Sequence, residues 1–95
     1  MTKQEMMNKI SEILSIRTFF VSTGSSEPRE FFVTVANQLG IQDLSANKGK
    51  VDLARLILQV LGEDWDDSYS SEGSTITKKY FAELLKVIEI TFKDK

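Results

Sequence analysis

A short phrase occurs twice in this chain, once in each half. Residues 22–32 read STGSSEPREFF and residues 71–81 read SEGSTITKKYF, so each copy has a glycine, hydroxyl residues, a cation and two adjacent aromatic residues. Both copies continue into apolar residues at helical spacing. A helix with one apolar stripe must bury it against another element. The phrase therefore predicts two pseudo-repeated helical hairpins, 1–46 and 47–95, packed about an approximate two-fold axis within a single domain, 1–95.

The apolar spacing predicts an all-α fold, a compact domain of four to five helices. The expected helices are Lys3–Leu14, Pro28–Leu39, Val51–Leu61 and Thr77–Phe92. Between the helices of each half, aromatic and β-branched residues indicate short extended links. The third helix is expected at the centre. Its inward side is predicted to contain Leu53, Leu56, Ile57, Val60 and Leu61, with Ala54 and Leu58 widening the apolar arc.

Composition excludes several functional classes. The chain has 41% hydrophobic and 27% charged residues, a net charge of -2, no cysteine and no histidine. Disulfides and thiolate zinc sites are therefore excluded, and no imidazole is present to activate Ser25 or Ser74 as a nucleophile. No apolar run is long enough to cross a bilayer. We expect no catalytic residues, no cofactor, no membrane partner and a cytoplasmic location.

The acidic run at 63–67 lies in a segment that can be compared with the pattern of a calcium-binding loop. Counted from Asp64 as the first ligand, Tyr69 occupies the sixth position, where glycine is needed, and Thr75 the twelfth, where glutamate is needed. The loop fails at both positions. We therefore expect no metal site, and instead a solvated acidic link with Trp65 and Tyr69 packed on the core.

The glycine-hydroxyl turns have two interpretations. Their hydroxyl groups can cap the free N–H groups of the following helix. The same N–H groups, hydroxyls and neighbouring cations can also bind a phosphate, and two such turns on one face can contact two phosphates. The candidate phosphate or DNA site consists of Gly24, Ser25, Ser26, Arg29, Gly73, Ser74, Thr75, Thr77, Lys78 and Lys79.

The second half also shows a family resemblance. The segment LARLI at 53–57, followed by Leu61-Gly62, Trp65-Asp66 and the turn at 71–77, resembles a small helical module associated with restriction-type endonucleases and their accessory regions. The resemblance implies a DNA-associated, non-catalytic role, because no nuclease motif accompanies it. The residues it implies are Gly73, Ser74, Thr75, Thr77 and Lys78, with Gly24, Ser25, Ser26 and Arg29 as first-half counterparts.

Two functions follow from the sequence. The first is a non-catalytic DNA-binding or DNA-targeting module that contacts phosphates through the paired turns. The alternative is a protein-interaction or assembly module without nucleic-acid binding, using exposed aromatic residues such as Phe19, Phe31 or Tyr80. The net acidity of the chain favours the alternative, whereas the paired turns and the resemblance favour DNA.

Overall fold

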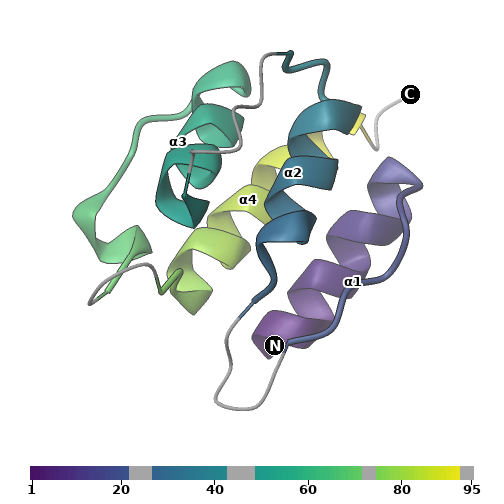
Figure 1. Cartoon of the computed structure of the whole chain (residues 1–95), viewed down its shortest axis with the longest axis horizontal. Helices are drawn as coiled ribbons and strands as arrows, with labels where there is room; N and C mark the ends of the chain where they lie inside the picture. Colours follow the sequence, from purple (N-terminus) through teal and green to yellow (C-terminus); the bar gives the residue numbers. More distant parts are fainter. Residues whose placement is uncertain (22–26, 43–48, 72–74, 93–95) are drawn as a thin grey trace.

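Four α-helices make up most of the fold (Figure 1). The computed structural model describes residues 1–21, 27–42, 49–71 and 75–92. The helices are α1 (Lys3–Leu14), α2 (Arg29–Gln38), α3 (Lys50–Val60) and α4 (Lys78–Phe92), with a 3₁₀ turn, η1 (Asp67–Tyr69), before α4. Within these ranges the only β-type pairing is an isolated bridge between Ser70 and Ile76. The predicted all-α fold class is confirmed.

Helix α1 begins and ends where the sequence predicts because its boundaries are local. The Thr2 hydroxyl accepts a hydrogen bond from the Glu5 N–H (3.1 Å), and the Glu5 carboxylate accepts one from the Thr2 N–H (2.8 Å). This capping box satisfies two donors that a helix start otherwise leaves unpaired. The hydrogen bonds to Thr2 also hold the pKa of Glu5 below its usual value. Ser15, with a left-handed φ of 57°, ends the helix.

The four helices pack in two pairs, α1 beside α4 and α2 beside α3. Helices α2 and α4 lie in the middle, and α3 lies on one side (Figure 1). The expectation that the third helix is central is therefore wrong. The aromatic residues explain this, because α2 and α4 each contribute two large rings to the middle of the core, whereas α3 contributes only aliphatic side chains.

An aromatic cluster joins α2 to α4. The adjacent rings of Phe31 and Phe32 are 5.4 Å apart at 83°, and those of Tyr80 and Phe81 are 5.5 Å apart at 85°. Across the interface, Phe31 and Phe81 are separated by 6.0 Å at 52°, and Phe32 and Tyr80 by 6.2 Å at 56°. The two copies of the phrase thus have nearly equal ring geometry, which is compatible with a two-fold relation between the halves.

The same cluster corrects the expected interaction surface. Phe19, Phe31 and Tyr80 were expected to be exposed, but all three are buried. Their rings are better placed against other rings than in water, because edge-to-face pairs add to the free energy of apolar burial. Among the described aromatic residues, the strongly exposed one is Phe20, at 74%.

Tyr80 links this cluster to α3 and to the acidic link. Its hydroxyl donates a hydrogen bond to the Ala54 carbonyl oxygen at 3.0 Å. Burial raises the pKa of Tyr80 far above its usual value, so the phenol stays a neutral donor. The rings of Trp65 and Tyr69 lie 6.0 and 5.9 Å from the Tyr80 ring. The predicted packing of Trp65 and Tyr69 on the core is confirmed.

The face that α3 presents to the core matches the prediction only in part, because Leu53 and Ile57 are buried but other predicted residues are not. Leu58 is fully buried, whereas Val60 is 53% exposed and Leu56 and Leu61 are only partly buried. Its remaining buried side chains are those of Leu53, Ala54 and Ile57. Most sides of this helix carry its own apolar side chains, so the spacing of these residues alone does not determine which side faces the core. The contacts of α3 with α2 and with the Tyr80 hydroxyl determine it.

A pair of alanine substitutions tests this rotation. We expect Leu58→Ala to lower the free energy of unfolding by about 2–4 kcal/mol, because it leaves a cavity in the core. Val60→Ala is expected to change it by less than about 0.5 kcal/mol, since the side chain is largely in water. Urea denaturation of both variants measures the difference, and equal costs would contradict the observed face.

Candidate phosphate-binding site at the helix starts

The link after α1 returns the chain to the end where α1 begins. The Gln4 side-chain amide, in the first turn of α1, donates to the Phe19 carbonyl oxygen at 2.7 Å. Its oxygen accepts from the Val21 N–H, also at 2.7 Å. One side chain thus satisfies two backbone groups of the link and holds it along α1. Helix α2 consequently starts near the start of α1, not opposite its end.

The link before α4 makes a similar return through backbone contacts. The Thr77 N–H donates to the Tyr69 carbonyl oxygen at 3.0 Å, and the Ser71 N–H donates to the Thr75 carbonyl oxygen at 2.9 Å. With the Ser70–Ile76 bridge, these bonds form a short turn just before α4. The predicted extended link is present here over very few residues.

A buried carboxylate joins the starts of all four helices. Glu27, two residues before α2, is only 2% exposed. It lies 3.3 Å from the Lys50 ammonium and 3.4 Å from the Lys3 ammonium, and it accepts the Ile76 N–H at 3.1 Å. Lys3 begins α1, Lys50 begins α3, and Ile76 lies two residues before α4. We call Glu27, Lys3, Lys50 and Ile76 the Glu27 cluster.

The Glu27 cluster corrects the predicted hairpins. All four helices begin at the same end of the molecule, which is the lower end in Figure 1. An α-helical hairpin needs its second helix to start where the first one ends. Here the long links carry the chain back, so the two helices of each half start together. The halves therefore share an order of elements, but they are not hairpins.

Sequence reasoning missed the Glu27 cluster. The sequence analysis assigns no role of their own to Glu27, which lies within the repeated phrase, or to Lys3 and Lys50. One signal was available, because Glu27 and Ile76 lie 49 residues apart and occupy matching positions of the repeated phrase. In the second copy of the phrase an apolar residue, Ile76, occupies the position that Glu27 occupies in the first copy. If this position is buried in both copies, the carboxylate of Glu27 needs a charged or hydrogen-bonding partner.

The cluster also contains more positive than negative charge. The side chains of Lys3 and Lys50 are 12% and 16% exposed and face one carboxylate. The amino end of each helix adds a partial positive charge. Lys50 makes a further bond, from its ammonium to the Glu27 carbonyl oxygen at 3.1 Å. The helix starts are therefore held together by charge-assisted hydrogen bonds that also leave the region electropositive.

The structure places five of the ten predicted site residues. Arg29 begins α2 and is partly buried, and Lys78 and Lys79 begin α4 and are exposed. Thr75 is exposed, and Thr77 is partly buried with its hydroxyl donating to the Ser68 carbonyl oxygen at 2.6 Å. The other five lie outside the described residues, and they are Gly24, Ser25, Ser26, Gly73 and Ser74.

The residues at the starts of α2 and α4 can be compared with the two interpretations of the turns, helix capping and anion binding. Pro28 occupies the N-cap position of α2 and makes no side-chain capping bond. The Thr77 hydroxyl donates its hydrogen bond to the Ser68 carbonyl oxygen, so its proton is not offered to a ligand. The N–H groups of Lys78 and Lys79 make no hydrogen bond to any described residue. As far as the described residues go, two backbone donors and two ammonium groups are thus left for a ligand at the start of α4.

The acidic link behaves as a solvated segment. Asp66 accepts hydrogen bonds from the Ser68 N–H at 2.8 Å and from the Ser68 hydroxyl at 2.5 Å. The Ser68 hydroxyl and N–H hold the pKa of Asp66 below its usual value. In the described part of the chain, acidic residues form no cluster of three that could hold a metal ion.

We compared the chain with known proteins. Protein-family models, curated proteins and solved structures give no match to this chain. Among the described residues, none of the helices has the length and apolar character needed to cross a membrane.

Replacing the buried acid tests its structural role. We expect Glu27→Gln to lower the free energy of unfolding by about 2–4 kcal/mol, because two mostly buried ammonium groups lose their counter-charge. Glu30→Gln is the matched control, since Glu30 is an exposed acid in the first turn of α2. It is expected to cost no more than about 0.5 kcal/mol. Thermal and urea unfolding measure both, and a cost of Glu27→Gln no larger than that of the control would contradict the role.

Proposed function

We propose that this chain is a non-catalytic DNA-binding or DNA-targeting module that contacts backbone phosphates at its helix starts. One observation carries the proposal, the hydrogen bond between Glu27 and the Ile76 N–H. Because Glu27 precedes α2 and Ile76 precedes α4, the residues of the repeated phrase that directly precede these two helices are in contact. A phosphate chain can then meet both starts at once.

The chemistry of α4 suits a phosphate oxygen. Lys78 and Lys79 supply exposed ammonium groups, and their N–H groups lie at the positive end of a 15-residue helix. Phosphates are bound in this way at helix amino ends, and such contacts position a protein on DNA without reading bases. Arg29 at the start of α2 adds a cation on the neighbouring helix.

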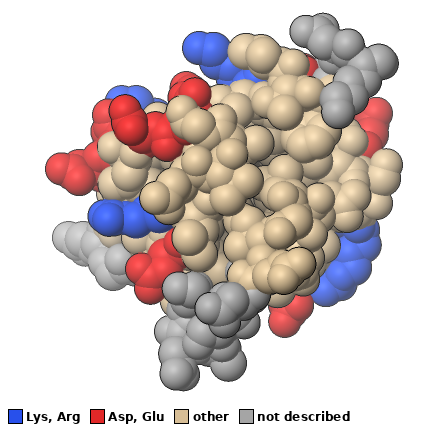
Figure 2. Space-filling view, turned by 90° about the horizontal axis from the view of Figure 1, so that it is seen from above, with Lys and Arg blue, Asp and Glu red and all other residues tan. Residues whose placement is uncertain are grey.

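The distribution of charge favours this end of the molecule despite the net charge of -2. The cations in the first turns of the helices are Lys3, Arg29, Lys50, Lys78 and Lys79, and the acids in or just before these turns are Glu5, Glu27, Glu30 and Asp52. Asp66 also lies close enough to Lys79 to interact with it electrostatically. Figure 2 looks down on the opposite end and shows a broad central area without charged groups. In this proposal an anionic ligand is attracted by the exposed ammonium groups of Lys78 and Lys79 at the start of α4.

A double substitution tests phosphate contact. We expect Lys78→Gln/Lys79→Gln to weaken binding to a short DNA duplex and to reduce the slope of log K against log salt by about 2, because two phosphate contacts are lost. Lys9→Gln/Lys86→Gln is the matched control, as it removes the same charge from exposed sites further along α1 and α4. Fluorescence anisotropy of a labelled duplex at several salt concentrations measures both slopes.

Two results would reject the proposal. One is no binding of the duplex at low salt, and the other is the same loss of slope in the two double variants. Amide NMR spectra with added duplex give the location, and the largest shifts are expected at 27–31 and 75–79. Shifts centred on the acidic link instead would place the ligand elsewhere.

A further inference from the structure

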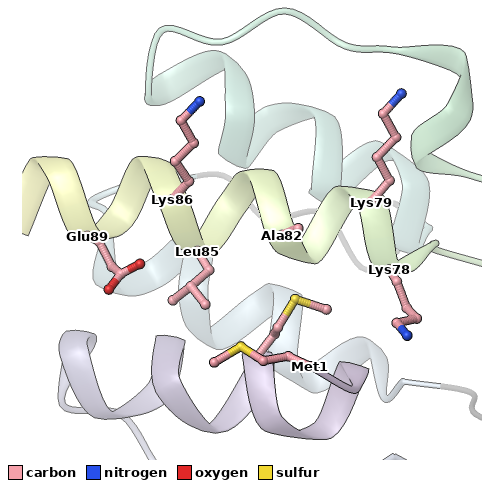
Figure 3. Close-up of a pocket in the computed structure, with 8 residues that line it drawn as sticks. Met1, Lys78, Lys79, Ala82, Leu85, Lys86 and Glu89 are labelled. Carbon is pink, nitrogen blue, oxygen red and sulfur yellow. The ribbon is translucent and has the colours of Figure 1, made fainter.

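An open groove of about 520 Å³ runs between α1 and α4, next to the helix starts (Figure 3). Apolar side chains form its floor, with Met6 from α1 and Ala82 and Leu85 from α4. Figure 3 shows Leu85 and Met1 in the space between the two helices. Met6 and Leu85 also belong to the buried core, so the floor is anchored by the fold.

Lysines dominate the α4 rim of this groove. Lys78, Lys79 and Lys86 line it, with Glu89 as the single acid. Figure 3 shows Lys79 and Lys86 extending to the same side of α4, away from α1. None of these three lysines forms an ion pair with a described residue. Lys78 and Lys79 interact electrostatically with Glu5 and Asp66, respectively, but no described acid forms a close ion pair with them. An apolar strip flanked by such ammonium groups matches a ligand with an apolar stripe beside a row of carboxylates.

The dimensions of the groove suit a polypeptide helix. From Lys78 to Glu89 the groove follows α4 for roughly 16 Å, which is about three helical turns. The groove is open along its length, whereas a small-molecule site encloses most of its ligand. The small side chain of Ala82 permits close approach, and a methionine floor adapts to the side chains of different partners.

We propose that this groove binds an acidic amphipathic helix of a partner protein, with its apolar stripe on the exposed side chains of Met1 and Ala82 and on the outer edges of Met6 and Leu85. Carboxylates on the flank of that helix pair with Lys79 and Lys86. The partner helix runs antiparallel to α4. Its positive amino end then lies near Glu89, and its negative carboxyl end lies near Lys78 and the starts of α1 and α4.

None of the four described helices provides this ligand, because each of them carries cations as well as acids. Helix α1 carries Lys3 and Lys9 as well as Glu5 and Glu12, so no flank of it is purely acidic. The acidic run at 63–67 is a link and not a helix, and Trp65 within it is packed on Tyr69 and Tyr80. Charge complementarity therefore favours a different protein over a second copy.

The groove-binding inference goes beyond the proposed DNA contacts and is tested with a separate ligand. The probe is a fluorescent peptide of about four turns with leucine at every third or fourth position and glutamate on one flank. We expect it to bind at least about tenfold more tightly than a peptide of the same composition with the leucines dispersed. Replacing its glutamates by lysines is expected to abolish binding.

Substitutions locate the peptide on the protein. We expect Ala82→Glu and Lys86→Glu each to weaken binding about tenfold or more, through burial of an unpaired charge or loss of a rim cation. Gln59→Glu is the matched control for Ala82→Glu, because it adds the same charge at an exposed position on α3, and it should leave affinity unchanged. Circular dichroism of each variant checks that the helices remain folded.

Several outcomes would overturn the groove assignment while leaving the DNA proposal intact. One is equal affinity of the protein for the patterned peptide and for the peptide with dispersed leucines. Another is that Ala82→Glu and Gln59→Glu weaken binding of the patterned peptide equally. A concentration-dependent dimer that Ala82→Glu dissociates would assign the groove to a second copy. Binding to vesicles of anionic phospholipid without peptide binding would assign it to a membrane surface. Conversely, peptide binding without any DNA binding would reject only the proposed function.

Discussion

The buried carboxylate of Glu27 receives hydrogen bonds from three segments that are distant along the chain. A carboxylate out of water is stable only if its oxygens are paired, so the positions of Lys3, Lys50 and Ile76 are fixed together. Since each of these residues stands at or just before a different helix, this requirement brings the starts of the four helices together in space. The common end of the four helices follows from it.

That common end has an electrostatic consequence. Helices that start together add their partial positive charges in one region, and in a short bundle this is unfavourable unless an anion is present. Glu27 is such an anion within the protein. Its one negative charge faces two ammonium groups and several helix ends, so the Glu27 cluster keeps an excess of positive charge. The structural role of Glu27 and the proposed phosphate contacts of Lys78 and Lys79 thus rest on one arrangement.

The features that could be predicted from the sequence are those fixed by neighbours in the chain. Helix α1 was predicted to its terminal residues because its capping box and apolar spacing are local. The rotation of α3 was not predicted, because most of its sides are apolar and only the contacts with α2 and Tyr80 select one. The Glu27 cluster was not predicted for a similar reason, because the partners of Glu27 lie 23 to 49 residues away from it in the chain. At the candidate site, the repeated phrase correctly indicated neighbouring helix starts, but the orientation of the helices within each half depended on the long return links.

The start of α4 belongs both to the proposed phosphate site and to the proposed groove, because Lys78 and Lys79 line each of them. A carboxylate-rich helix and a phosphate chain require the same ammonium groups, and each cation can neutralise only one of the ligands at a time. Binding of one must therefore weaken binding of the other, and by the same factor in either order. The groove extends along α4 to Lys86 and Glu89, whereas the phosphate site extends across to α2, so the competition is confined to the end they share. An acidic partner on this groove would consequently regulate access to DNA through charge alone, with no change in the fold.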